Sequence, residues 1–242
     1  MSAQSILITG ATSGIGEALA YFYADQGWLV HAIGRNQDKL TEMQEQSSSI
    51  SGYACDLSHA SAIESLKAEY KDASFDVIVL NAGTCRYMDV SQFDSQYFTS
   101  QMRENLASMV YCIEALQHTL RTGSVLALMS SSARYLPFPK AQAYGASKAA
   151  IAYLAESLAL EWHVKDIHVA TISPGFVKTP LTDKNEFDMP FMISAEDAAN
   201  RIYQGINKRK HDIAFPKRLI WTLHMLNALP KSLYFNMMKS KL

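Results

Sequence analysis

The sequence predicts an α/β fold in which a doubly wound parallel sheet carries helices on both faces. Short apolar runs rich in β-branched residues alternate with helical patterns along the 242 residues, and a glycine-rich turn directly follows the first run. Such alternation is typical of parallel β-α-β units, whose strands are buried on both sides. No Pro-, Gly- or Ser-rich linker, repeat or low-complexity tract interrupts the chain, so we expect one domain over residues 1–242.

Six apolar runs have the length and composition of buried strands, and five longer segments have apolar residues at helical spacing. The predicted strands are Ile6–Thr9, Leu29–Ile33, Gly52–Cys55, Phe75–Leu80, Ser124–Met129 and Ile167–Ile172. The predicted helices are Ile15–Gln26, Gln37–Gln46, Ala60–Tyr70, Ser95–Leu120 and Ala141–His163. Ligands bind such sheets beyond the carboxyl ends of the strands, so we expect functional residues in the loops that follow the strands.

Three glycines mark the turn between the first strand and the first helix, in the sequence ILITGATSGIGEALA. Gly10, Gly14 and Gly16 would permit a tight turn, a close approach of the backbone to a pyrophosphate, and close packing of the helix. The helix N-terminus would then face the phosphates with its unpaired N–H groups and its dipole. A tight turn without any ligand is the alternative interpretation.

The composition describes an ordinary globular protein with a formal net charge of −1. This balance argues against a nucleic-acid partner, for which a strongly basic surface is expected. Cys55, Cys85 and Cys112 are widely spaced, which indicates a reduced chain without a disulfide framework, and no histidine spacing suggests a metal site. Neither a cleavable signal nor an apolar run of bilayer-spanning length is evident, so we expect a cytoplasmic protein.

Tyr144 and Lys148 lie four residues apart in AQAYGASKAA and would share one face of the last predicted helix. An ammonium held close to a phenol favours the phenolate, so we expect Lys148 to lower the pKa of Tyr144 toward neutral pH. Ser131 lies 13 residues upstream of Tyr144. The pair taken alone is a weak motif, and an exposed tyrosine beside a solvated lysine is the alternative.

Several short motifs occur together along the chain. They are TGATSGIG, NAG at Asn81–Gly83, Ser131, YGASK at Tyr144–Lys148, and PGFVKTP at Pro174–Pro180. In this order and approximate spacing, the motifs resemble those of the short-chain dehydrogenase/reductase family, over about Ile6 to Pro216. The resemblance implies a Rossmann-like three-layer αβα sandwich of about seven strands, a nicotinamide cofactor, a small-molecule carbonyl or alcohol substrate, and a homo-oligomer, either a dimer or a tetramer.

The end of the second predicted strand bears on the choice between NADP(H) and NAD(H). NAD-dependent members of the family carry an acidic residue there, whereas this chain has Gly34 followed by Arg35. A guanidinium can pair with the 2′-phosphate of NADP(H), with added contacts from the hydroxyls of Thr12 and Ser13, so NADP(H) is favoured. Ser13 departs from the base that some NADP-dependent members carry at this point, and a solvated Arg35 is the alternative.

The resemblance places further cofactor contacts in the loops after the later strands. Asp56 and Leu57 resemble the pair at the adenine edge, although Asp56 would also serve as a helix cap. The residues expected at the cofactor are Gly10, Thr12, Ser13, Gly14, Ile15, Gly16, Arg35, Asn36, Asp56, Leu57, Asn81, Ala82, Gly83, Tyr144, Lys148, Pro174, Gly175, Val177 and Thr179.

The family's catalytic positions match Asn105, Ser131, Tyr144 and Lys148. In the roles that the resemblance implies, Tyr144 exchanges a proton with the substrate oxygen, and Ser131 hydrogen-bonds that oxygen as negative charge develops. Lys148 holds the nicotinamide ribose, and Asn105 holds a water that relays protons to Lys148. Ser131 lies between two other serines, so its assignment depends on the 13-residue spacing to Tyr144, and a neighbouring serine remains open.

Residues 180–215 are predicted to form a lid over the substrate. Apolar side chains expected near the cleft mouth would exclude water and suit hydrophobic carbonyl compounds, although core packing explains them equally well. These side chains are Phe138, Phe176, Phe187, Met189, Phe191 and Met192. Arg134 departs from the small residue usual in the family, and it either reaches toward the cleft or lies exposed to solvent.

The C-terminal extension, residues 216–242, contains five Lys or Arg and no Asp or Glu. Its apolar residues, including Leu219, Trp221 and Leu223, predict a basic amphipathic helix that is interrupted near Pro230. Three interpretations are open: packing on the domain or on a subunit partner, contact with a membrane surface, or a cap on the substrate channel.

These features together predict an NADP(H)-dependent oxidoreductase that interconverts a carbonyl compound and its alcohol by hydride transfer, with Tyr144 as general acid/base. One alternative is an NADP(H)-sensing regulatory protein on the same fold, because dinucleotide folds are reused for sensing. Another is an epimerase or dehydratase of the same superfamily, which would share the Tyr and the Lys. Retention of all four catalytic positions argues against the sensor, and the chain length and glycine spacing argue against the epimerase or dehydratase.

Overall fold

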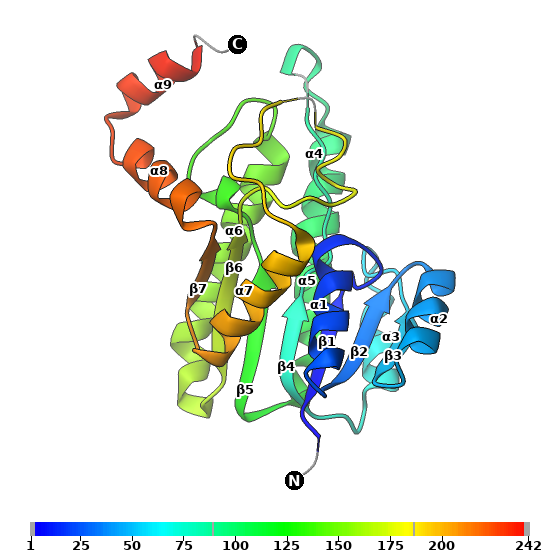
Figure 1. Cartoon of the computed structure of the whole chain (residues 1–242). Helices are drawn as coiled ribbons and strands as arrows, with labels where there is room; N and C mark the ends of the chain where they lie inside the picture. The colour runs from blue at the N-terminus through cyan, green and yellow to red at the C-terminus, as the bar shows by residue number, and fades with distance from the viewer. Residues whose placement is uncertain (1–2, 89, 186, 240–242) are drawn as a thin grey trace.

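In the computed structural model, which describes residues 3–88, 90–185 and 187–239, seven strands form one parallel sheet (Figure 1). The order of the strands is β3-β2-β1-β4-β5-β6-β7. The strands are β1 (Ser5–Thr9), β2 (Leu29–Gly34), β3 (Ile50–Ala54), β4 (Phe75–Leu80), β5 (Leu120–Met129), β6 (His168–Pro174) and β7 (Asp212–Phe215). The predicted Rossmann-like, doubly wound sheet is therefore confirmed.

Helices cover both faces of the sheet and complete three layers. They are α1 (Gly14–Asp25), α2 (Gln37–Gln46), α3 (Ala62–Glu69), α4 (Ser95–Met102), α5 (Ser108–Leu116), α6 (Gln142–Trp162), α7 (Ala195–Asn207), α8 (Lys217–Asn227) and α9 (Lys231–Lys239). Helices α1, α2 and α7 pack on one face, whereas α3, α5 and α6 pack on the other.

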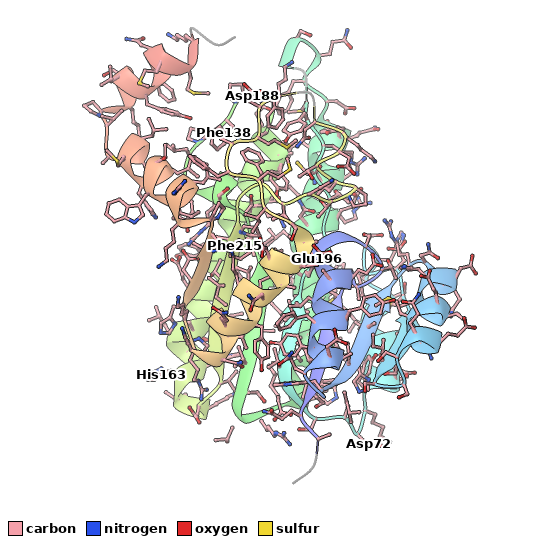
Figure 2. All side chains as sticks on the ribbon, viewed as in Figure 1. Asp72, Phe138, His163, Asp188, Glu196 and Phe215 are labelled. Atoms are coloured by element: carbon pink, nitrogen blue, oxygen red, sulfur yellow. The ribbon has the colours of Figure 1, made fainter. Side chains whose placement is uncertain are left out.

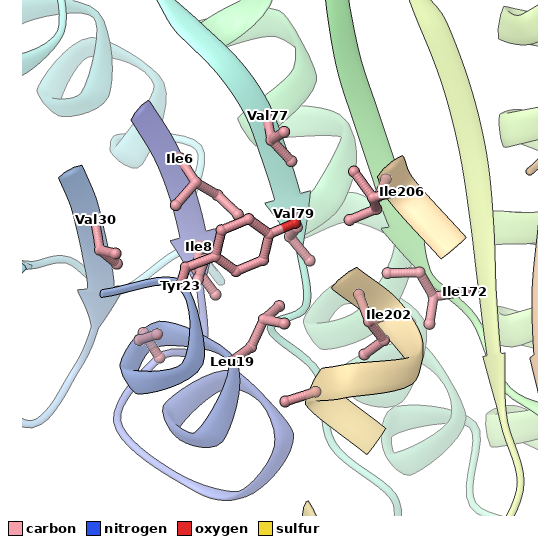
Figure 3. Close-up of a cluster of buried hydrophobic side chains, with 14 of the residues drawn as sticks. Ile6, Ile8, Leu19, Tyr23, Val30, Val77, Val79, Ile172, Ile202 and Ile206 are labelled. Atoms are coloured by element: carbon pink, nitrogen blue, oxygen red, sulfur yellow. The ribbon is translucent and has the colours of Figure 1, made fainter. Parts of the chain in front are cut away.

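Each central strand contributes buried side chains to two separate cores, one on each face of the sheet. Along β1, Ile6 and Ile8 point into the core beneath α1 and α7, and Leu7 points into the opposite core beneath α5 and α6. Figure 3 shows the first of these cores, in which Tyr23 and Leu19 of α1 lie over the strands. Each large apolar side chain removed from water in this way contributes roughly 1.5–3 kcal/mol. Because successive side chains point into one core or the other, nearly every residue of a central strand is apolar.

The single helix predicted over Ser95–Leu120 is wrong in two respects. Helices α4 and α5 are separated by one π-helical turn at Arg103–Ala107, which carries Asn105. The C-terminal end is also too long, because β5 already begins at Leu120, which pairs with Phe75 of β4. Pairing with a strand distant in the sequence outweighs the local helical pattern here.

The region 180–215 contains more regular structure than the predicted lid. Only its first part is loop, because α7 starts at Ala195 and is followed by β7. Ser194 caps α7 by accepting a hydrogen bond from Asp197 N at 3.1 Å. Ala198 and Ile202 are fully buried in the core with α1. The predicted boundary at residue 215 is therefore wrong, since residues 195–215 belong to the αβα layers.

The C-terminal extension forms two helices, α8 and α9, which separate at Pro230 as predicted. Leu219, Leu223 and Tyr234 are buried against Leu136. The Tyr234 hydroxyl donates a hydrogen bond to the carbonyl of Pro137 at 2.7 Å. One face of the extension therefore packs on the domain. Within the described residues, no helix combines the length and apolar character needed to cross a membrane.

Alanine substitutions at two helical glycines are expected to change the stability of the protein in opposite directions. A Cβ on Gly16 would lie 2.2 Å from the Gly10 carbonyl oxygen, whereas a Cβ on Gly145 would meet its nearest atom, the Ala133 oxygen, at 3.7 Å. We expect Gly16→Ala to lower the free energy of unfolding by roughly 1–3 kcal/mol through overpacking. Gly145→Ala should raise it by about 0.5–1 kcal/mol, because Ala is the better helix former. Urea denaturation measures both, and similar effects of the two variants would contradict this packing.

Candidate active site

A cavity of about 460 Å³ lies at the C-terminal edge of the sheet, where the strand order reverses between β1 and β4. Its walls come from the loops that follow β1 to β6. Figure 2 shows this end of the molecule near Phe138 and Asp188, whereas Asp72 and His163 lie at the opposite end. The volume is typical of ligand pockets, and this position in a doubly wound sheet is where ligands bind.

Every residue predicted at the cofactor lines this cavity except Gly16 and Asn36. Gly16 lies beneath the turn, where it packs against the backbone of Gly10 and the side chain of Asn81. Asn36 is used by the fold instead, because its side-chain oxygen accepts a hydrogen bond from Lys39 N at 3.1 Å and caps α2. Sequence motifs thus located the cavity, while packing and capping account for these two residues.

The glycine-rich turn gives this end of the cavity the features of an anion site. Gly10 and Gly14 have φ angles of +66° and +57°, which favour glycine. Asn81 fixes the turn, since its side-chain nitrogen donates to Thr9 O at 3.0 Å and to Gly10 O at 3.2 Å. Helix α1 begins at Gly14, and both Gly14 and Ile15 line the cavity. Its first N–H groups therefore suit the pyrophosphate of a dinucleotide.

Strand β2 ends with Gly34, which has no side chain, and the loop after it begins with the cationic residue Arg35. A Cβ on Gly34 would lie 2.4 Å from Thr12 Cγ2, so the close approach of these two loops leaves no room for an acidic side chain. Arg35 follows directly, lies exposed and lines the cavity. An exposed cation at this point of the cavity wall can pair with an anionic group of a bound ligand.

Asp56 has a structural role in addition to its place in the cavity wall. Its carboxylate accepts hydrogen bonds from Ser58 N at 3.0 Å and from Ser58 Oγ at 2.7 Å. These hydrogen bonds are the main reason why the pKa of Asp56 is lowered, and Arg35 contributes to the same direction. Asp56 therefore stabilises the turn at Ser58, and it does not cap α3, which begins at Ala62.

Tyr144, Lys148 and Ser131 meet at one wall of the cavity. Tyr144 and Lys148 are one turn apart near the start of α6, and Ser131 follows β5. The Lys148 ammonium donates to the Met129 carbonyl at 2.9 Å and lies 5.8 Å from the centre of the Tyr144 ring. Ser131 hydrogen-bonds Tyr144. The predicted proton-transfer group is thus assembled beside the predicted cofactor site.

Burial sets the protonation of this pair and contradicts one expectation. Burial raises the pKa of Tyr144 well above its usual value, and the hydrogen bond with Ser131 opposes this only in part. Burial also lowers the pKa of Lys148 to about 8. The prediction that Lys148 moves Tyr144 toward the phenolate is wrong, because desolvation of both groups favours their neutral forms. Tyr144 therefore keeps its proton at neutral pH and can donate it.

Asn105 is buried behind the cavity wall instead of lining it. Its oxygen accepts from Thr84 N at 2.7 Å, and its nitrogen donates to Thr84 O at 3.0 Å and to Ser147 Oγ at 3.0 Å. Ser147 in turn donates to the Tyr144 carbonyl at 2.7 Å. The side chain thus ties the loop after β4 to the first turn of α6. Its predicted role in holding a relay water stays a prediction.

Gly83 brings Asn105 and Lys148 to the same place. A Cβ on Gly83 would lie 3.1 Å from Asn105 Oδ1 and 3.4 Å from Lys148 Nζ. The two polar atoms therefore approach the exposed backbone of Gly83 from the protein side. Any larger residue here would push on both groups.

The cavity wall also contains polar residues that were not predicted from the sequence, among them Thr84, Glu104 and Lys184. The Thr84 hydroxyl donates to Glu104 Oε2 at 3.0 Å, and Glu104 also pairs with Arg86. The signal that could have identified Glu104 is its place next to Asn105, which the family resemblance had already singled out. Lys184 comes from the loop before α7, whose position no local pattern fixes.

The predicted substrate-side residues lie elsewhere. Arg134 is neither in the cleft nor exposed, because its half-buried guanidinium pairs with Asp212 at 2.6 Å and Glu156 at 3.2 Å, and it donates to Ser173 Oγ at 3.1 Å. Phe187 packs edge-on against Tyr87, with ring centres 5.5 Å apart.

None of the six apolar side chains predicted at the cleft mouth lines the cavity; Pro180, Leu181 and Thr182 do. Among the described residues, no group of three or more His, Cys, Asp or Glu could hold a metal ion.

Comparison with known proteins agrees with this geometry. The family model described as short chain dehydrogenase matches residues 4–189. An uncharacterized oxidoreductase of Myxococcus xanthus is 29% identical over 97% of this chain and 96% of its own length. A 3beta-hydroxysteroid dehydrogenase of Mediterraneibacter gnavus is 33% identical over 76% of this chain and 70% of its own length.

Solved structures share the fold. A short-chain dehydrogenase from Streptomyces avermitilis superposes with a TM-score of 0.83 at 22% identity, covering 93% of this chain and 92% of that one. A Sphingobium yanoikuyae enzyme in complex with NADPH has a TM-score of 0.78 at 19% identity over 88% of each chain. One from Burkholderia phymatum in complex with NAD has 0.82 at 18% identity over 92% of each. The chain belongs to the short-chain dehydrogenase family.

Proposed function

We propose that this protein is an NADP(H)-dependent oxidoreductase that interconverts a small carbonyl compound and its alcohol, with Tyr144 as the general acid/base. The observation that carries the proposal is the meeting of Tyr144, Ser131 and Lys148 on one wall of a cavity whose other end is the glycine-rich turn. Dinucleotide and substrate would therefore lie side by side. One relative, the M. gnavus enzyme, is named as a dehydrogenase of a hydroxysteroid, which is an alcohol.

The chain's own residues supply the proton chemistry. The nicotinamide, when bound, supplies or accepts the hydride. During reduction, the Tyr144 hydroxyl donates its proton to the substrate oxygen, and Ser131 donates a hydrogen bond to the same oxygen as its charge grows. Because burial raises the pKa of Tyr144, the proton is present at the start of reduction at neutral pH. During oxidation, Tyr144 must first lose its own proton, and its phenolate oxygen then accepts the proton of the alcohol.

The choice of NADP(H) depends on the loop after β2. The solved neighbours include complexes with NADPH and with NAD, so the fold alone does not select the cofactor. In this chain, Gly34 removes the acidic side chain that would repel a 2′-phosphate, and Arg35 places a permanent cation on the cavity wall. Charge complementarity therefore favours the phosphorylated dinucleotide.

Replacement of Tyr144 with Phe tests the proposed acid. We expect Tyr144→Phe to lower kcat for ketone reduction by about 10²- to 10⁴-fold, because the proton donor is lost while the ring is kept. The dissociation constant for NADPH, measured by the fluorescence of the bound nucleotide, should change little. A panel of ketones, aldehydes and quinones supplies the substrate. Equal rates for both proteins would remove Tyr144 from the mechanism.

Replacement of Arg35 with Ala tests the cofactor preference. We expect Arg35→Ala to weaken NADPH binding by roughly 10- to 100-fold, because a charge-assisted hydrogen bond is lost, and to leave NADH binding unchanged. Lys39→Ala is the matched control, since Lys39 is a nearby cation that pairs with Glu17 and Glu42 and does not line the cavity. A uniform loss for both nucleotides, or full retention of NADPH affinity, contradicts the assignment of Arg35.

The pKa of Lys148 predicts a pH dependence for NADPH binding. Lys148 has a pKa lowered to about 8, so it is charged below that pH and neutral above it. Binding of the anionic nucleotide favours the charged form, so the dissociation constant should rise above about pH 8, by at most tenfold per pH unit. Titrations across this range measure the slope. Lys148→Met should abolish it, whereas Arg35→Ala should keep it, because that variant leaves Lys148 in place. If the dissociation constant of the unaltered protein does not change with pH, the pH dependence cannot be assigned to Lys148.

A further inference from the structure

Helices α8 and α9 form an arm with two distinct faces, one on the domain and one toward solvent. On α8, Leu219 and Leu223 are buried, whereas Trp221 is 70% exposed and Met225 is 66% exposed. Trp221 and Met225 are four residues apart, and Lys217 lies four residues before Trp221, so the three share one side of the helix. This side carries a large aromatic residue that no buried contact explains.

Helix α9 repeats the arrangement. Tyr234 points inward, whereas Phe235 and Leu233 are each 47% exposed. Phe235 lies four residues from both Lys231 and Lys239, so a basic residue flanks it on each side of the same stripe. We call the exposed residues Lys217, Arg218, Trp221, Met225, Lys231, Phe235 and Lys239 the outer face of the arm.

The charge of the outer face restricts its partner. Residues 216–242 contain five Lys or Arg and no Asp or Glu, although the whole chain has a net charge of −1. A second copy docked by the same face would bring like charges together across a two-fold axis. Anionic lipid headgroups complement the charge instead. A tryptophan amid apolar and basic residues is typical of helices that lie in the membrane interface.

We propose that the outer face of the arm is a docking surface for a membrane that contains anionic lipid. The arm extends from the end of β7 at the same end of the molecule as the cavity (Figure 1). Its base touches the cavity wall, because a Cβ on Gly175 would lie 2.4 Å from Leu219 Cδ2. Docking through the outer face would therefore hold the site close to the bilayer surface, independently of which cofactor it takes.

Vesicle co-sedimentation of the full chain tests the proposal. We expect the protein to sediment at low salt with vesicles of equimolar phosphatidylcholine and phosphatidylglycerol, and not with phosphatidylcholine alone. High salt should release it, because screening weakens attraction between exposed charges. Absence of sedimentation with the anionic vesicles at low salt would overturn the proposal.

Variants of the outer face identify the contact. Lys217→Gln with Lys231→Gln should weaken partitioning by about 25-fold, since each basic residue contributes about five-fold. Trp221→Ser with Met225→Ser should weaken it by roughly tenfold or more. Leu160→Ser with Val164→Ser is the matched control. These exposed apolar side chains lie in the last turn of α6 and in the 3-10 turn that directly follows it, and they should not affect binding. Unchanged unfolding midpoints would show that the variants remain folded.

Tryptophan fluorescence gives a second measurement. Trp28 is buried and Trp162 is half-buried, so Trp221 is the tryptophan whose surroundings would change on docking. Anionic vesicles should shift the emission to shorter wavelength, and Trp221→Phe should remove the shift. Light scattering measures the molar mass of the protein in solution. If the outer-face variants change this mass and leave vesicle binding intact, the face is an interface between copies of the chain and the proposal is wrong.

Discussion

The site depends on the contact between Gly16 and the backbone of Gly10. A Cβ on Gly16 would lie 2.2 Å from Gly10 O and 2.5 Å from the side-chain nitrogen of Asn81, so no larger residue fits there. This contact holds α1 against the end of β1, and the hydrogen bonds of Asn81 join both to the end of β4. The helix N-terminus, the turn and the loop after β4 thereby open into one cavity at the point where the strand order reverses.

Hydrogen bonds also connect the loop after β4 to helix α6. Thr84 follows Gly83, and its backbone holds Asn105, which hydrogen-bonds Ser147 and through it the carbonyl of Tyr144. The π-helical turn at Arg103–Ala107 places Asn105 in this position, as such turns often do at functional sites. Buried and partly buried hydrogen bonds therefore link the loop after β4 to the start of α6, and such bonds are costly to break.

The same burial that forms this network determines the chemistry of the pair on α6. Desolvation keeps Tyr144 protonated and lowers the pKa of Lys148 to about 8. A phenol that keeps its proton at neutral pH can donate that proton, and the Lys148 ammonium beside it loses its own proton above about pH 8. At the other end of the chain, the arm places basic and apolar side chains outside the core.

Much of the fold and of the cavity could be predicted from the sequence, because the signals are local. Apolar runs such as Phe75–Leu80 identify strands, and the glycines from Gly10 to Gly16 require one kind of turn. Spacing placed Tyr144 and Lys148 on one helix face, since helical periodicity is independent of the rest of the molecule.

Tertiary structure decided what depends on distant residues. Arg134 turns toward Asp212, 78 residues away, and not toward substrate. Leu120 leaves the helical pattern to pair with β4, and the pKa of Tyr144 is raised and not lowered. The sequence by itself determined most of the elements and most of the residues at the cavity, because backbone preferences and periodicity act over a few residues. Only the tertiary structure determined which side chains pair with each other and which groups are protonated, because burial and charge pairing act through space.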